Sequence, residues 1–352
     1  MRVLVVDDSA LMRRWLKECF ASEPGIESLT ARDGKDALAK LDSFDPDVVT
    51  LDINMPEMDG LTCLAQIMAR APRPVVMLSS LTDAGALATL EALELGAVDY
   101  IAKPSGTVSH DLKLIFPQIL AKVRAAARIR VTGPKRPSRR PAAPPRPDAG
   151  PRPAAAPQGA ARHDLVLIGS STGGPKALEA VLFPLGPDFP VPILIAQHMP
   201  KRFTKVFAER LTQQGALPVI EVTGPTELRP GAAYLAQGDA DVQVSRRRDR
   251  LVATPVPANP ELVWNPSVNH MVATAQAVLP PGRLLAVLLT GMGDDGAAAM
   301  TRLHQAGGTT IAQSEASSAI FGMPRALIEA GGASRIIDVD RIAYTLMRLV
   351  AG

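Results

Sequence analysis

Short apolar runs separated by helical patterns organise the first part of the chain. These runs cover residues 3–6, 48–51, 75–78 and 100–102. Runs this short are typical of buried strands, and the segments between them have helical spacing. In residues 10–21 the helical spacing places Leu11, Trp15 and Leu16 on one face. Buried strands that alternate with helices predict a doubly wound α/β domain with a parallel sheet.

The same alternation returns after residue 163. Predicted strands lie at residues 165–168, 193–196 and 284–289. Helices are expected to begin at Pro175, to cover residues 201–212, and to begin again near Ala297. Residues 218–257 contain shorter β segments with turns. The pattern predicts a second doubly wound, Rossmann-like parallel-sheet domain with a β-hairpin insertion.

A segment rich in Pro, Arg and Ala separates the two patterns. We therefore expect domains at residues 1–125 and 163–352, joined by a linker at 126–162. The linker has no apolar periodicity and cannot bury enough surface to offset ordering, so it should be disordered or extended.

The charge of the chain is concentrated in this linker. Residues 128–162 contain nine basic residues and one aspartate, a net charge of +8. Since the whole chain carries +3, the remainder carries −5. Mildly acidic folded regions argue against a nucleic-acid-binding protein. Charge runs in linkers are usually only solvated, although contact with RNA or anionic lipid stays open.

The sequence shows neither the features of a secreted protein nor those of a membrane protein. The chain has only two cysteines, Cys19 and Cys63, and these require no disulfide. It shows no basic-then-apolar signal at its beginning and no apolar run of membrane-spanning length. We expect a cytoplasmic protein.

Polar residues follow the predicted strands of the first domain. Asp7 and Asp8 end the first strand, Asp52 the second run, Ser79 the next and Lys103 the last. Ligands of such sheets bind at the carboxyl ends of the strands. Three carboxylates there repel one another unless a cation such as Mg²⁺ lies among them, and a carboxylate can accept a phosphoryl group. Each residue alone is more often a helix cap or a surface lysine.

The order of these motifs carries more weight than any one of them. VVDDS, LDINMP, MLSS and YIAKP together resemble the receiver domain of bacterial response regulators over about residues 1–122. The resemblance implies a flavodoxin-like fold with Asp52 as phosphoacceptor. It implies Mg²⁺ ligands at Asp7, Asp8, Asp52 and the backbone carbonyl of Asn54. It also implies phosphoryl contacts from Ser79 and Lys103, and a switch role for Tyr100.

A glycine-rich turn joins the first predicted strand and helix of the second domain. The sequence IGSSTGGPKAL could form a phosphate cradle, but neither GxxxxGK[ST] nor GxGxxG fits it. It could instead expose a serine nucleophile at a strand-to-helix turn, although the GxSxG pattern is also absent. Ser171 taken alone could be a helix cap.

Two later strand ends supply partners for Ser171. AQHMP places His198 at the same sheet edge, and LLAVLLTGMGDDG ends with Asp294 and Asp295. A lone histidine at a strand end is more often structural than catalytic. The two aspartates could bind a metal, but no second ligand cluster supports this. Together the three strand ends supply a nucleophile, a proton acceptor and an orienting carboxylate.

GSSTGGPKAL, AQHMPKRFTKVFAERL and LLTGMGDDGA resemble the chemotaxis protein-glutamate methylesterase family (CheB). The resemblance covers the whole chain except the linker. It implies Ser171, rather than Ser170, as nucleophile and His198 as general base. It implies Asp295, rather than Asp294, as the third residue of the triad, with oxyanion contacts from Thr172 and the backbone of Met292. It implies no cofactor in the catalytic domain.

The resemblance also implies a biological role. The protein would remove methyl esters from glutamate side chains of chemoreceptors, releasing methanol, and would deamidate receptor glutamines. An unphosphorylated receiver would cover the catalytic cleft, and phosphorylation by a chemotaxis histidine kinase would open it. We expect peripheral association with receptor arrays.

One segment departs from the family pattern. Residues 264–270 read WNPSVNH where the family usually has a His-Arg-Pro-Ser-Val-Asp-like sequence, so contacts with the substrate could differ here. Three other functions stay open. The chain could be a response regulator with a DNA- or protein-binding output, a scaffold that keeps the fold without the chemistry, or a hydrolase of a different ester.

Overall fold

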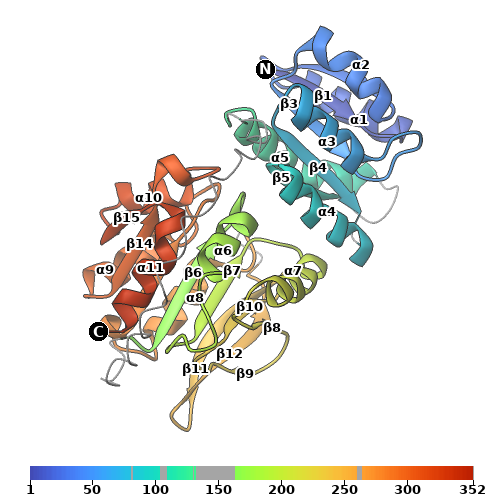
Figure 1. Ribbon diagram of the computed structural model, residues 1–352. Helices are drawn as coiled ribbons and strands as arrows, with labels where there is room; N and C mark the ends of the chain where they lie inside the picture. The colour runs from blue at the N-terminus through green and yellow to red at the C-terminus, as the bar shows by residue number, and fades with distance from the viewer. Residues whose placement is uncertain (81, 104–108, 130, 132–162, 260–263, 352) are drawn as a thin grey trace, which may run out of the picture.

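The computed structural model describes residues 1–80, 82–103, 109–129, 131, 163–259 and 264–351, which form two α/β units (Figure 1). The N-terminal unit consists of β1 (Arg2–Val6), α1 (Ala10–Ala21), β2 (Glu27–Ala31), α2 (Gly34–Phe44), β3 (Val48–Asp52), α3 (Gly60–Arg70), β4 (Val75–Ser80), α4 (Asp83–Leu95), β5 (Asp99–Lys103) and α5 (Ser109–Ala126). Its parallel sheet has the order β2-β1-β3-β4-β5. Helices α1 and α5 pack on one face, and α2, α3 and α4 pack on the other. The predicted doubly wound domain is confirmed.

Two details of this unit differ from the sequence analysis. β2 is an additional edge strand, and its sequence ESLTA contains no apolar run because only Ala31 is fully buried. In α1, Leu11 is 58% exposed whereas Leu16 is fully buried, so the predicted common face of these residues is wrong. The buried face instead contains Leu16 and Phe20, because residues four apart lie above one another on a helix.

The C-terminal unit is larger and contains two sheets. Its elements are β6 (Leu165–Ser170), α6 (Gly174–Leu182), β7 (Ile193–Gln197), α7 (Lys201–Gln214), β8 (Val219–Val222), β9 (Thr226–Glu227), β10 (Ala233–Ala236), β11 (Ala240–Arg247), β12 (Arg250–Pro257), α8 (Val268–Gln276), β13 (Leu284–Leu288), α9 (Ala297–Gln305), β14 (Thr309–Gln313), α10 (Met323–Glu329), β15 (Arg335–Ile337) and α11 (Val339–Val350). The parallel sheet has the order β15-β14-β13-β6-β7-β10-β8.

The predicted β-hairpin insertion is confirmed. β11 and β12 pair antiparallel around Arg248 and Asp249, which both have positive φ, and β9 completes this small sheet. Figure 1 shows the hairpin extending away from the N-terminal unit. In the parallel sheet, α6, α7 and α11 pack on one face and α8, α9 and α10 on the other. The central strands β13, β6 and β7 are buried along their whole length, as their continuous apolar sequences require.

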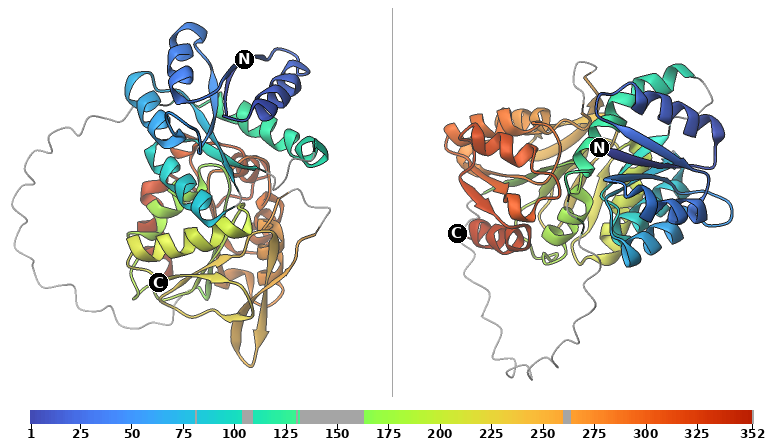
Figure 2. Two further views of the ribbon diagram at one scale, coloured as in Figure 1. Left: turned by 90° about the vertical axis from the view of Figure 1, so that its right-hand side faces the viewer. Right: turned by 90° about the horizontal axis from the view of Figure 1, so that it is seen from above.

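The two units contact each other along α4 and β5 of the first and along α6 and α7 of the second (Figures 1 and 2). The rings of Tyr100 and Phe203 stack with centroids 4.7 Å apart. Arg210 of α7 forms an ion pair with Glu94 of α4. One hydrophobic cluster continues across this boundary. The strand that carries the expected switch residue therefore lies directly on the C-terminal unit.

The expected linker begins where α5 ends. The helix extends to Ala126 and is followed by a hydrogen-bonded turn at residues 127–129. Residues 132–162 lie outside the described part of the chain, so the disorder of the linker stays a prediction. Within the described residues, no helix is both long and apolar enough to span a membrane.

Candidate active site

Three neighbouring strands of the C-terminal unit bring the predicted triad together. Ser171 follows β6, His198 follows β7, and Asp295 lies in the loop after β13. Because these strands are adjacent and parallel in the order β13-β6-β7, their carboxyl ends meet at one edge of the sheet. Ser171 and His198 line one pocket of about 180 Å³. The three strand ends that the sequence analysis grouped are therefore adjacent in the structure.

His198 and Asp295 form a buried pair. His198 Nε2 lies 2.9 Å from Asp295 Oδ2. Burial alone would raise the pKa of Asp295, but the hydrogen bond from His198 and backbone donors hold that pKa below its ordinary value. His198 Nδ1 is buried and has no hydrogen-bond partner among the described residues. No hydrogen bond joins Ser171 Oγ to His198 there, so Nδ1 is the nitrogen left to accept a proton.

The segment that departs from the family pattern supports this pair. Val268 N–H donates to Asp295 Oδ2 at 2.7 Å, and Asn269 N–H donates to Oδ1 at 2.9 Å. The hydroxyl of Ser267, the N-cap of α8, donates to Oδ1 at 3.3 Å. The positive end of a helix thus stabilises the carboxylate. Asp294 is exposed, in contrast.

Gln197, the residue before His198, fixes both catalytic loops. Its Nε2 donates to the carbonyl of Ser171 at 3.0 Å and to that of His198 at 3.1 Å, while its Oε1 accepts from Ser170 Oγ at 2.7 Å. A Cβ at Gly174 would lie 2.0 Å from Gln197 Oε1. Glycine at that position therefore leaves the space that this side chain occupies.

The two expected oxyanion residues lie on either side of Ser171. Thr172 follows it directly before α6, and Met292 lies in the loop after β13. Among the described residues, the N–H groups of Thr172 and Met292 donate no hydrogen bond. The hydroxyl of Thr172, however, donates to Asp99 Oδ2 of the N-terminal unit at 2.6 Å. Residues of β5 and α5 also line the pocket of Ser171, so the N-terminal unit covers it.

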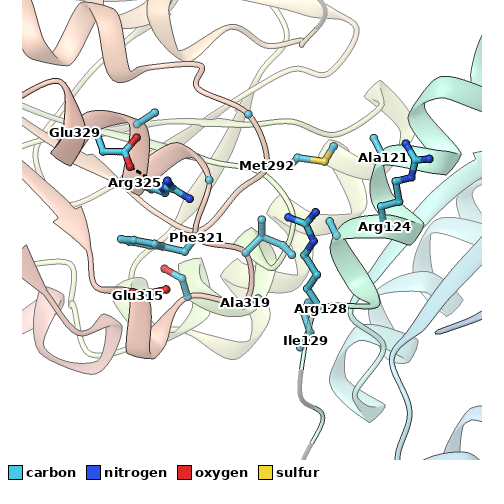
Figure 3. A pocket seen from close by; sticks show the side chains of 16 residues that line it. Ala121, Arg124, Arg128, Ile129, Met292, Glu315, Ala319, Phe321, Arg325 and Glu329 are labelled. Atoms are coloured by element: carbon cyan, nitrogen blue, oxygen red, sulfur yellow. Dashed lines mark hydrogen bonds and ion pairs between the residues drawn. The ribbon is translucent and has the colours of Figure 1, made fainter. Parts of the chain in front are cut away.

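A second, larger cavity of about 640 Å³ lies between the two units (Figure 3). Arg124 and Arg128 at the end of α5 line one side, and Phe321 and Arg325 line the other. The cavity extends to Met292. The covering of the active site is therefore tight beside His198 and open beside the loop after β13.

The acidic residues of the N-terminal unit also gather at one place. Carboxylate oxygens of Asp7, Asp8 and Asp52 lie within 4.8 Å of one another. Lys103 Nζ lies 2.8 Å from Asp7 Oδ2 and 2.7 Å from Asp52 Oδ2. Burial raises the pKa of Asp52 despite this lysine. One ammonium does not balance three carboxylates, which is the condition that a divalent cation relieves.

The remaining predicted residues of this unit lie around the cluster or face away from it. Asn54 is exposed in the loop two residues after Asp52. Ser79 is buried at the end of β4, and its hydroxyl donates to the carbonyl of Gly85 at 3.0 Å. Tyr100 is buried against Phe203, and burial raises the pKa of its phenol.

The comparisons with known proteins agree with these two sites. The family model for CheB methylesterase matches residues 166–346, and the model for the response regulator receiver domain matches residues 3–111. A protein-glutamate methylesterase/protein-glutamine glutaminase of Rhodospirillum rubrum is 53% identical over 98% of this chain and 95% of its own length. The chain belongs to the CheB methylesterase family. A relative with the same name from Vibrio cholerae is 46% identical over 99% of this chain and 97% of its own.

A solved structure supports the same assignment. The CheB methylesterase catalytic domain of Thermotoga maritima is similar to 53% of this chain and 99% of that chain, with 34% sequence identity and a TM-score of 0.52. The CheB methylesterase family is therefore supported both by the sequence and by the fold of the C-terminal unit.

Sequence reasoning missed three residues of this CheB methylesterase site. Gln197 could have been noticed as a polar residue that ends an otherwise apolar strand. Trp264 could have been noticed as one of only two tryptophans; its ring stacks on His198 with centroids 5.5 Å apart and planes 4° apart. Asp99 gave no local signal, because its partner Thr172 is 73 residues away.

Proposed function

We propose that this protein is a phosphorylation-activated esterase that removes methyl groups from glutamate γ-methyl esters of chemoreceptors and deamidates receptor glutamines. One observation carries the proposal. His198, held through Nε2 by Asp295, has a buried and unpaired Nδ1 and shares a pocket with Ser171, which the N-terminal unit covers. We further propose a receiver domain at residues 1–125, a linker at 126–162 and a catalytic domain at 163–352.

The chemistry follows the arrangement of the three side chains. Ser171 Oγ attacks the γ-carbonyl carbon while His198 Nδ1 accepts its proton, and Asp295 orients the imidazole. The N–H groups of Thr172 and Met292 stabilise the negative charge on the carbonyl oxygen. His198 returns the proton to the departing methanol, and water then hydrolyses the acyl-enzyme. With glutamine, ammonia departs instead.

The acidic cluster fits a magnesium ion and a phosphoryl group. Asp7, Asp8, Asp52 and the carbonyl of Asn54 would hold Mg²⁺, which supplies charge neutralisation during phosphorylation of Asp52. Lys103 already contacts Asp52 and is positioned to hold phosphoryl oxygens. The hydroxyl of Ser79, which donates to the carbonyl of Gly85, would donate to the phosphoryl group instead. The donor is a chemotaxis histidine kinase.

Regulation acts through the contacts of β5. Tyr100 and Asp99 are adjacent, so movement of this strand after phosphorylation withdraws both from the catalytic domain. The hydroxyl of Thr172 then loses Asp99, and Ser171 becomes accessible to the substrate. Receptors are membrane proteins with cytoplasmic methylation sites, so we propose that the protein works in the cytoplasm at the periphery of receptor arrays.

Methanol release from membranes with methylated receptors tests the proposal. The intact protein is compared with Ser171→Ala, each with and without acetyl phosphate and Mg²⁺. We expect release that requires Ser171 and increases with the phosphodonor. Release that requires Ser171 but ignores the donor would contradict the regulation alone. No release by a folded, phosphorylated protein would contradict the esterase and favour a binding output or another ester.

A further inference from the structure

Trp264 contacts the two halves of the catalytic machinery. Its ring stacks in parallel on the imidazole of His198, with centroids 5.5 Å apart. A Cβ placed on Gly293 would lie 3.4 Å from the indole Nε1, so the indole also packs against the turn beside Met292. Trp264 also lines the pocket that contains Ser171.

The geometry restricts the orientation of His198. Asp295 fixes the ring at Nε2, and this single hydrogen bond alone allows the imidazole to rotate about the Nε2–Oδ2 direction. The indole face removes that freedom, because the imidazole can stay stacked on the indole only while the two ring planes are parallel. It therefore determines where the unpaired Nδ1 is directed.

The indole face also acts on charge. When Ser171 attacks, His198 becomes an imidazolium, and a cation within about 6 Å of an aromatic centroid is stabilised by the ring. The charged and titratable groups around His198 are Asp295 on its own side and, in the shared pocket, Asp239 together with Lys122 and Tyr100 of the N-terminal unit. Lys122 is paired with Asp99 and leaves with that unit when the site opens.

We propose that Trp264 is a positioning residue that holds the His198 ring for proton transfer and stabilises its imidazolium form. This inference rests on the proposed role of His198 as the general base. Trp264 contacts the base and packs against the turn beside Met292, so its main effect is expected on the rate of the chemical step.

Two variants distinguish the effect of the aromatic face of Trp264 from the effect of its size. Trp264→Leu keeps an apolar side chain but removes the face, whereas Trp264→Phe restores a face. With receptor membranes, acetyl phosphate and Mg²⁺, we expect Trp264→Leu to lower kcat about fivefold, with a smaller change in KM. Because the indole face stabilises the imidazolium that forms during the reaction, its loss should move the acid limb of the kcat/KM profile to lower pH by about half a pH unit. Trp264→Phe should recover most of both changes.

A second measurement does not depend on activity. In NMR spectra of the full chain, assigned by substitution among the five histidines, the ring protons of His198 should shift when Trp264→Leu removes the stacked indole, and they should return towards the wild-type position in Trp264→Phe. Unchanged ring-proton shifts and an unchanged acid limb would overturn the proposal, even if kcat fell. Equal effects of both variants would overturn it too. If the wild type releases no methanol, the proposed function fails, while the ring-proton shifts still decide whether Trp264 holds His198.

Discussion

The two units place carboxylates at the same position of related folds, the carboxyl edge of a parallel sheet. They differ in the groups that balance the negative charge there. Asp295 receives hydrogen bonds from two backbone N–H groups, a hydroxyl and His198. In the acidic cluster, Lys103 pairs with Asp7 and Asp52, and no ion pair among the described residues reaches Asp8. The carboxylate of the catalytic edge is therefore satisfied by donors of the protein itself, whereas the acidic edge keeps an excess of negative charge that a bound cation would balance.

The largest expected effect tests the sheet edge that carries the catalytic residues. Asp295→Asn removes the charge that stabilises imidazolium and reverses the hydrogen bond to His198, so we expect kcat to fall about 10⁴-fold with or without phosphodonor. Asp294→Asn is the matched control, because this neighbour is exposed, and it should stay within about twofold of the wild type. Methanol release measures both. A loss below tenfold for Asp295→Asn would show that the carboxylate is not part of the mechanism.

The next effect tests the acidic edge. Asp52→Asn removes the proposed phosphoacceptor, so addition of acetyl phosphate and Mg²⁺ should no longer raise the rate. The lost activation is expected within the usual range of coupling, about 5- to 150-fold. Asp42→Asn, an exposed residue of α2, should keep the full response. A donor response that survives in Asp52→Asn would place the phosphorylation elsewhere.

A smaller effect tests the contact between the two units. Asp99→Asn weakens a charge-assisted hydrogen bond to Thr172, so the covered arrangement becomes less stable and the rate without phosphodonor should rise roughly fivefold. The stimulation by donor should shrink by the same factor. Asp83→Asn is the control, since its ion pair with Arg202 is exposed and long at 4.0 Å. A wild-type rate for Asp99→Asn would mean that this bond does not maintain the covered state.

A last effect concerns the stability of the N-terminal unit and not the rate. Burial raises the pKa of the Cys63 thiol to about 12, while an unfolded cysteine titrates near about 8.5. Cys63 therefore favours the folded state fully below about pH 8.5, and this contribution is lost as pH rises towards 12. By pH 10 the loss is about 2 kcal/mol.

Urea unfolding followed by Trp15 fluorescence measures this loss. The free energy of unfolding of the wild type should decrease between pH 8 and pH 10 by about 2 kcal/mol more than that of Cys63→Ala. Both proteins carry Trp264→Phe, so that Trp15 is the one remaining tryptophan and its emission reports on the N-terminal unit. Equal decreases in both proteins would contradict a buried, protonated thiol.

Much of the fold could be predicted from the sequence, because strongly apolar strands indicate the two sheets, and the motifs at the strand ends predict which side chains gather at the sheet edges. The edge strand β2 was not predicted, because a half-exposed strand needs no apolar run. Leu11 was misplaced because three nearby apolar residues do not specify which pair faces the sheet. The contacts of Trp264 and Asp99 depend on loops and on docking between units, for which no local pattern exists.

The bond between Thr172 and Asp99 has a consequence for ligands. In the regulation proposed above, one interface opposes both the opening of the catalytic pocket and the change that follows phosphorylation of Asp52, so the two sites would be thermodynamically linked. Such linkage is reciprocal. If phosphorylation increases the affinity of a pocket-binding compound by a given factor, the bound compound stabilises the phosphorylated receiver by the same factor. An inhibitor of the esterase would then prolong the signal that switched the esterase on.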